Sequence, residues 1–132
     1  MKTIVLKFGG TSVGTIDRIK KVCKIIAFYK KKNNKVAVVS SAMGGVTNEL
    51  VNKSKQISNN FDRAEYDALL STGEQVSCAL IAGRLKHNGF KSRSWTSWQL
   101  PIITDGPHSS ARISSVNVKE LSSYIKSGGI PV

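Results

Sequence analysis

The fold of this chain is decided by the stretch Thr3-Ile4-Val5-Leu6-Lys7-Phe8-Gly9-Gly10 near its N-terminus. Residues 3–8 are mostly apolar or β-branched and two glycines follow, so the stretch predicts a buried strand that ends in a turn. Apolar residues then recur at the helical period over residues 16–29, Asn33-Asn34 closes this helix, and residues 36–39 form a second apolar run. A strand, a helix and a strand in this order predict a parallel pair.

A loop and a second helix come next. Residues 40–45 are small and include glycine, and Thr47 is expected to cap the following helix, with Glu49 in its first turn. The positions expected to face inward on this helix are Leu50, Val51, Ser54 and Ile57.

Two helical segments are expected beyond residue 61. Asp62 and Glu65 predict a capping box for a helix that ends near Leu70. Gly73 is expected to interrupt it. A further helix over residues 74–87 is apolar on almost every side, which predicts burial on several sides.

The last third of the chain predicts short strands and one helix. Residues 90–95 are compatible with a third strand, and Asp105-Gly106-Pro107 is a turn signal typical of a hairpin. Residues 117–126 predict a helix ended by Gly128-Gly129, and residues 130–132 begin another apolar run. All elements together predict one α/β unit, a three-layer α/β/α sandwich with a mainly parallel sheet that is incomplete in this chain.

Length and composition are typical of one globular domain. The chain has 132 residues, of which 40% are hydrophobic and 21% are charged. No apolar run approaches the roughly 18 residues of a membrane span, and the N-terminus lacks a secretory signal, so a cytoplasmic protein that does not bind membranes is expected. Cys23 and Cys78 form no metal-binding pattern, so no metal site is expected, and both thiols are assigned to the core.

The net charge of +12 is unevenly distributed. Ten of the 20 Lys and Arg residues lie within residues 1–35, which hold one acidic residue. Many of them share one side of the first predicted helix, opposite its apolar residues, which is typical of a solvated helix face. A nucleic-acid-binding module is the remote alternative. It is disfavoured because no aromatic side chains are interleaved with the basic ones.

Three segments follow strands or open helices, which is where parallel sheets build ligand sites. In residues 7–12, Lys7 and the following glycines allow an ammonium and backbone N–H groups to approach one phosphate. Residues 40–48 place hydroxyls and glycines before a helix, which suits a phosphate or a substrate carboxylate. Glu74 is either a favourable charge at a helix N-terminus or a buried carboxylate that binds a substrate ammonium. Each segment taken alone is also compatible with an ordinary turn or cap.

Taken together, these segments resemble the three N-terminal signatures of aspartokinases, in the family's order and spacing. The strings are Lys7-Phe8-Gly9-Gly10-Thr11-Ser12-Val13, Val38-Val39-Ser40-Ser41-Ala42-Met43-Gly44-Gly45-Val46-Thr47 and Leu70-Ser71-Thr72-Gly73-Glu74-Gln75. The resemblance continues to Ala111-Arg112-Ile113 and covers essentially the whole chain. Pro107-His108-Ser109-Ser110 departs from it at a place where the family varies.

The resemblance implies a role for each matching residue. Lys7 would be the catalytic residue that contacts the transferring phosphoryl group. The phosphate- and ATP-binding residues would be Lys7, Phe8, Gly9, Gly10 and Ser41. The residues that bind the amino-acid substrate would be Gly45, Val46, Thr47, Asn48, Glu49 and Glu74, the last by contacting the α-ammonium of aspartate.

The implied fold is of the amino-acid kinase type, and the implied reaction is phosphorylation of the side-chain carboxylate of L-aspartate by ATP. The product, 4-phospho-L-aspartate, would enter lysine, threonine, methionine and diaminopimelate biosynthesis. Because the side chain of aspartate has a pKa of about 3.9, it is a nucleophile at neutral pH without a general base. Lys7, backbone N–H groups and Mg²⁺ held mainly by the nucleotide would balance the phosphoryl charge.

By the same resemblance, residues 1–132 would be the N-terminal portion of one catalytic domain. The nucleotide-binding half and the regulatory ACT domains would be absent, so the isolated chain is expected to be poorly active. Longer family members are usually homo-oligomers. The alternatives are an inactive structural fragment and another amino-acid kinase.

Overall fold

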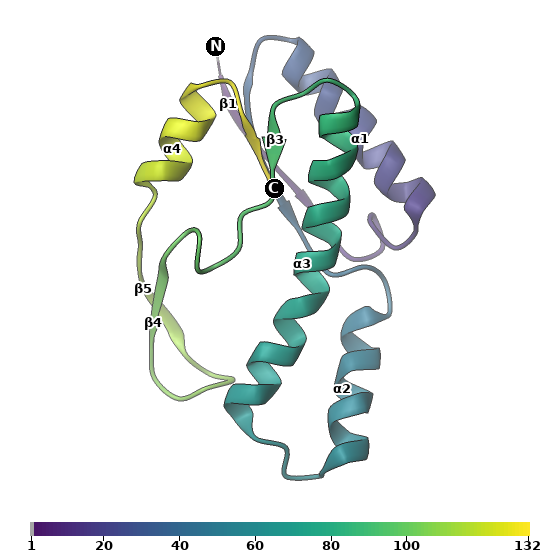
Figure 1. The fold of residues 1–132 in the computed structure, drawn as a ribbon, viewed down its shortest axis with the longest axis vertical. Helices are drawn as coiled ribbons and strands as arrows, with labels where there is room; N and C mark the ends of the chain where they lie inside the picture. Colours follow the sequence, from purple (N-terminus) through teal and green to yellow (C-terminus); the bar gives the residue numbers. More distant parts are fainter. Residues whose placement is uncertain (1) are drawn as a thin grey trace.

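The computed structural model describes residues 2–132, which form six strands and four helices (Figure 1). The strands are β1 (Thr3–Phe8), β2 (Lys35–Ser40), β3 (Ser92–Arg93), β4 (Ile102–Asp105), β5 (Arg112–Val116) and β6 (Ile130–Pro131). The helices are α1 (Ile16–Lys31), α2 (Val46–Ile57), α3 (Arg63–His87) and α4 (Lys119–Lys126). None of these helices is long and apolar enough to span a bilayer.

The central layer is made of two parallel strand pairs. β1 pairs with β2 from Thr3 opposite Lys35 to Phe8 opposite Ser40, which confirms the predicted parallel pair. β3 pairs in parallel with β6, and β6 also contacts β2. The strands predicted over residues 90–95 and 130–132 are therefore present, but each is only two residues long.

Helices cover both sides of these strands. α1 and α3 pack against each other and against β2, while α4 contacts β2 and β6. Figure 1 shows α4 on the opposite side of the strands from α1 and α3. This arrangement confirms the predicted α/β/α layering.

The apolar core lies between α1, α3 and the strands. Ile19, Cys23 and Ile26 of α1 meet Ile81 and Leu85 of α3 in this core. Val36, Val38 and Ile130 close it from the sheet side. Burial raises the pKa of the Cys23 thiol to about 11, so Cys23 is a neutral core side chain as predicted.

α3 corrects the prediction of two helices separated by Gly73. It is one helix of 25 residues, and Gly73 is buried inside it. A glycine inside a helix costs about 1 kcal/mol relative to alanine, and here the packing of α3 against its neighbours outweighs that cost. The predicted burial on several sides is also wrong, because α3 buries one face (Gly73, Ser77, Ile81, Ala82 and Leu85) and leaves Val76 and Leu80 exposed.

The start of α2 also differs from the prediction. Gly45, with φ of +84°, is the N-cap, and Thr47 lies inside the first turn. Glycine adopts this left-handed conformation without the strain that a side chain would bring.

Two residues expected to face inward are exposed, namely Ile16 of α1 at 51% and Ile57 of α2 at 78%. In contrast, Asp62 caps α3 as predicted, since its carboxylate accepts the N–H groups of Ala64 and Glu65.

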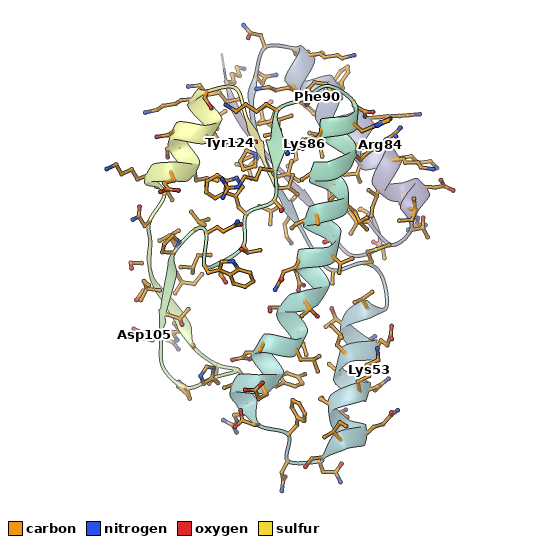
Figure 2. The ribbon with its side chains drawn as sticks, in the orientation of Figure 1. Lys53, Arg84, Lys86, Phe90, Asp105 and Tyr124 are labelled. Atoms are coloured by element: carbon orange, nitrogen blue, oxygen red, sulfur yellow. The ribbon has the colours of Figure 1, made fainter. Side chains whose placement is uncertain are left out.

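α4 is fixed to the sheet through Tyr124. The Tyr124 ring lies against Gly129, where a Cβ atom would clash with it, and its centroid is 5.6 Å from that of Trp95. Figure 2 shows Tyr124 directed from α4 toward the strands. The helix ends at Lys126 with Ser127 as its C-cap, and Gly128, with φ of +86°, follows directly, as the sequence predicts.

The predicted hairpin is present as the antiparallel pair β4–β5, and its tip is held by α3. Asp67 of α3 accepts the N–H of Ser109 at 2.9 Å and lies 3.0 Å from Nδ1 of His108. These contacts, the Ser109 N–H first, hold the pKa of the Asp67 carboxyl below its usual range.

We expect Leu85→Ala to lower the free energy of unfolding by about 3 kcal/mol, because Leu85 is fully buried and its truncation leaves a cavity. Leu80→Ala on the same helix is the matched control. Leu80 is 39% exposed, so its truncation should cost less than about 1.5 kcal/mol. Urea unfolding of both variants measures the difference, and equal losses would contradict this description of the core.

The contacts of Asp67 with His108 and Ser109, which we call the clasp at the hairpin tip, should weaken in acid. Because the pKa of Asp67 is lowered in the folded state, the contribution of its carboxylate is fully present above the usual carboxyl pKa and is lost as the pH falls through the lowered value. Asp67→Asn should reproduce this loss at neutral pH, whereas Asp105→Asn on β4 should not. The measurement is the hydrogen-exchange protection factor of the Ser109 amide, and protection that is unchanged in Asp67→Asn would argue against the clasp.

Candidate functional site

A cavity of about 480 Å³ lies where β1 and β2 end and α2 begins. The carboxyl ends of parallel strands are the usual location of ligand sites in α/β proteins. The lining residues come from the β1–α1 loop, the β2–α2 loop, the first turn of α2 and the middle of α3, and they are Gly10, Thr11, Ser41, Ala42, Met43, Gly44, Gly45, Thr47, Asn48 and Glu74.

The two loops pack backbone against backbone at glycine positions. A Cβ atom at Gly10 would lie 3.1 Å from the carbonyl oxygen of Ala42, and one at Gly14 would lie 3.2 Å from the carbonyl oxygen of Gly10. Gly44 lies against Gly14 in the same contact. The absence of side chains at these positions lets the main chains of both loops reach the cavity.

The first turn of α2 suits an anion. The N–H groups at the start of a helix have no acceptor within the helix, and the helix dipole places partial positive charge there. No side chain caps this helix at Gly45, and both Thr47 and Asn48 line the cavity. A phosphate or carboxylate group could therefore accept hydrogen bonds at this end of the cavity.

Glu74 supplies the negative charge of the cavity. Its Oε1 atom accepts the N–H of Ala42 at 3.3 Å, so the carboxylate is attached to the β2–α2 loop by one oxygen. The Glu74 side chain is exposed and belongs to the interior of α3, so it is neither a charge at a helix N-terminus nor a buried carboxylate, which were the two alternatives predicted for it. An exposed carboxylate with a free second oxygen can still bind an ammonium group.

The structure brings six of the predicted site residues together around this cavity. They are Gly10, Ser41, Gly45, Thr47, Asn48 and Glu74. Five others do not line it: Lys7, Phe8, Gly9, Val46 and Glu49.

The five residues that do not line the cavity lie on β1, in the loop after it and on α2. Lys7 is exposed on β1, and Phe8 packs against the apolar core, which places the two side chains on opposite faces of the strand. Gly9 precedes Gly10, which lines the cavity, in the sequence. Val46 faces Gly73. Glu49 forms an ion pair of 2.8 Å with Lys53, which projects from α2 in Figure 2. This ion pair lowers the pKa of Glu49.

Four lining residues were not assigned a role by sequence reasoning, namely Thr11, Ala42, Met43 and Gly44. Thr11 and Gly44 lie within the glycine-rich loops, so the loop pattern itself was the available signal. Ala42 contributes through its backbone N–H, which no side-chain pattern reveals.

A second cavity, of about 240 Å³, is also lined by Glu74. Trp95 and Trp98 form part of its wall, together with Cys78 of α3. Burial, and then the negative charge of Glu74, raise the pKa of the Cys78 thiol. Glu74 therefore lines both a cavity built mainly of loops and one with an aromatic wall.

A parallel α/β/α core with glycine-rich loops at the strand ends is an arrangement in which α/β proteins often bind phosphate-bearing ligands. A sequence model of the Amino acid kinase family matches residues 2–132, and the chain belongs to this family.

Several relatives with curated names are aspartokinases. The chain is 47% identical to the aspartokinase of Rickettsia felis over 135 residues, which is 100% of this chain and 34% of that protein. It is 48% identical to the aspartokinase of Geobacillus stearothermophilus, covering 100% of this chain and 32% of that protein. The chain thus spans about one third of the length of these relatives.

Solved structures agree with the family. Aspartate kinase from Synechocystis superposes with a TM-score of 0.84 at 40% identity, over 98% of this chain and 21% of that one. E. coli aspartokinase III, solved in complex with aspartate and ADP, gives a TM-score of 0.79 at 18% identity, over 99% of this chain and 40% of that one. The second match supports the fold alone.

We expect Gly73→Ala to destabilise the protein by about 1–3 kcal/mol, because the new Cβ would lie 2.9 Å from Cβ of Ala42 beside the cavity. Gly83→Ala on the same helix is the matched control. No atom outside its own helical turn lies within 4 Å of a Cβ there, so the substitution should stabilise by about 0.5–1 kcal/mol through helix propensity. Chemical unfolding separates the two, and stabilisation by both would disprove the close approach at Gly73.

Proposed function

We propose that this chain is part of an aspartate kinase, which transfers the γ-phosphoryl group of ATP to the side-chain carboxylate of L-aspartate and forms 4-phospho-L-aspartate. The observation that carries the proposal is the similarity to aspartokinases at 47% identity over the whole of this chain. The cavity supports it, since it combines a carboxylate with an anion-binding helix start.

The reaction needs little covalent chemistry from the protein. The side chain of aspartate has a pKa of about 3.9, so its carboxylate is already the nucleophile at neutral pH. One carboxylate oxygen attacks the γ-phosphorus, the bond to the β-phosphate oxygen breaks, and ADP leaves with the electron pair. The work left to the protein is to position the reactants and to neutralise charge.

In this proposal, Glu74 binds the positively charged group of the substrate, and the glycine-rich loops and the start of α2 bind its negatively charged groups and those of ATP. Glu74 binds the α-ammonium of aspartate through the carboxylate oxygen that does not accept the Ala42 N–H. Gly10 and Ser41 face the phosphate groups, and the first turn of α2 at Gly45, Thr47 and Asn48 binds the α-carboxylate. Lys7 is assigned to the transferring phosphoryl group, together with Gly9.

Other parts of the proposed enzyme come from outside residues 2–132. The relatives are about three times as long as this chain, so we assign the adenine- and ribose-binding half to sequence beyond it. Mg²⁺ would accompany ATP and supply charge neutralisation to its phosphates. Among the described residues, no three His, Cys, Asp or Glu side chains converge on one point.

The test is ADP release in the gene product that contains these residues, supplied with ATP, Mg²⁺ and aspartate. Glu74→Gln should raise the KM for aspartate about 10- to 100-fold and leave the KM for ATP within about threefold, because a charged hydrogen bond of about 1.5–3 kcal/mol to the ammonium is lost. Glu65→Gln, exposed on the same helix, is the matched control and should change neither constant.

Three results would count against the proposal. Absence of aspartate-dependent ADP release would remove the proposed activity. Turnover with glutamate in preference to aspartate would indicate another amino-acid kinase. An equal loss of affinity for ATP and aspartate in Glu74→Gln would remove the assigned role of Glu74.

A further inference from the structure

Ser77 is a fully buried serine in the middle of α3, with no exposed surface. It lies three residues after Glu74, so both side chains are on the same face of the helix. Its Oγ atom is 2.7 Å from the carbonyl oxygen of Ser41, 3.0 Å from the carbonyl oxygen of Glu74 and 3.3 Å from Oγ of Ser40.

The single hydroxyl proton of Ser77 can serve one acceptor at a time. The Ser41 carbonyl is the nearest, at 2.7 Å, and lies across the gap between α3 and the β2–α2 loop. The hydroxyl of Ser40 lies 3.1 Å from the same Ser41 carbonyl oxygen and 3.3 Å from Oγ of Ser77, so it can donate to either, at a longer distance than the Ser77 bond. The shortest bond of Ser77 is therefore one between elements rather than a local contact within the helix.

Ser77 and Glu74 hold the two sides of one peptide group. The carbonyl of Ser41 and the N–H of Ala42 belong to the same planar peptide unit, in which they point in opposite directions. Ser77 donates to the carbonyl at 2.7 Å, and Glu74 accepts the N–H at 3.3 Å. Two side chains of one rigid helix therefore fix the rotation of the Ser41–Ala42 peptide about its long axis.

These two hydrogen bonds to the Ser41–Ala42 peptide, which we call the clamp, also orient the Glu74 side chain. If the peptide rotates, its N–H turns away from Oε1 of Glu74, and the exposed carboxylate loses the one described hydrogen bond that orients it. Ser77 does not line the cavity, and it contacts the cavity residues through this peptide and, within α3, through the carbonyl oxygen of Glu74.

We propose that Ser77 is a positioning residue: by holding the Ser41 carbonyl, it orients the Ser41–Ala42 peptide and, through it, the Glu74 carboxylate that binds the amino-acid substrate. The part that concerns the substrate rests on the function proposed above. The clamp itself is a property of this chain and can be tested without turnover.

The first measurement is hydrogen exchange at the Ala42 amide in the gene product that contains these residues. Ser77→Ala should speed this exchange about fivefold, which corresponds to the loss of one neutral hydrogen bond. Ser54→Ala is the matched control, because Ser54 is also a buried helical serine, 3% exposed, whose Oγ bonds the Val51 carbonyl of its own helix at 2.8 Å. It should leave the Ala42 amide unchanged.

The second measurement separates positioning from general stability. Ser77→Ala should raise the KM for aspartate about fivefold and change the KM for ATP less than twofold, while Ser54→Ala changes neither. If Ser77→Ala fails to fold, Ser77→Cys replaces it, since a thiol fills the same place and donates weakly, and it should shift both readouts in the same direction.

The outcomes are distinguishable. Equal exchange at Ala42 in the Ser77 and Ser54 variants overturns the clamp. Faster exchange with an unchanged KM for aspartate, in an active enzyme, overturns its effect on Glu74. If the unmodified protein shows no aspartate-dependent turnover, the proposed function fails, and the exchange result still decides whether Ser77 holds the peptide.

Discussion

The site depends on the close approach of α3 to the loop that follows β2. Gly73 makes this approach possible, because any larger residue there would meet Cβ of Ala42. One turn of the helix then places Glu74 and Ser77 on either side of the Ser41–Ala42 peptide. The steric constraint comes first, and the hydrogen bonds that shape the cavity are formed only because it is satisfied.

Much of the fold could be predicted because it follows from local patterns. β1 is found at residues 3–8 as expected, and α1 and the hairpin are found where periodicity and turn residues place them. The pairing of β3 with β6 could not be predicted in the same way, since Ser92 and Ile130 are 38 residues apart and each strand has two residues. Such short segments carry almost no pattern of their own.

The errors have a common physical cause, which is that tertiary packing overrides local preference. Gly73 reads as a helix breaker in sequence, yet a small residue is what the contact with Ala42 requires. The loop residues of the site were predictable from their glycines and hydroxyls. The exposure of Glu74 depends on how α3 packs against the β2–α2 loop, which no motif specifies.

α3 is also a mechanical link along the molecule. Its 25 residues span about 37 Å as one helix, with Asp67 at the hairpin tip, Glu74 at the cavity and Leu85 in the apolar core. Because one continuous helix carries all three residues, the hairpin contact, the cavity carboxylate and the core packing share a single orientation. The buried side chains around Leu85 hold that orientation.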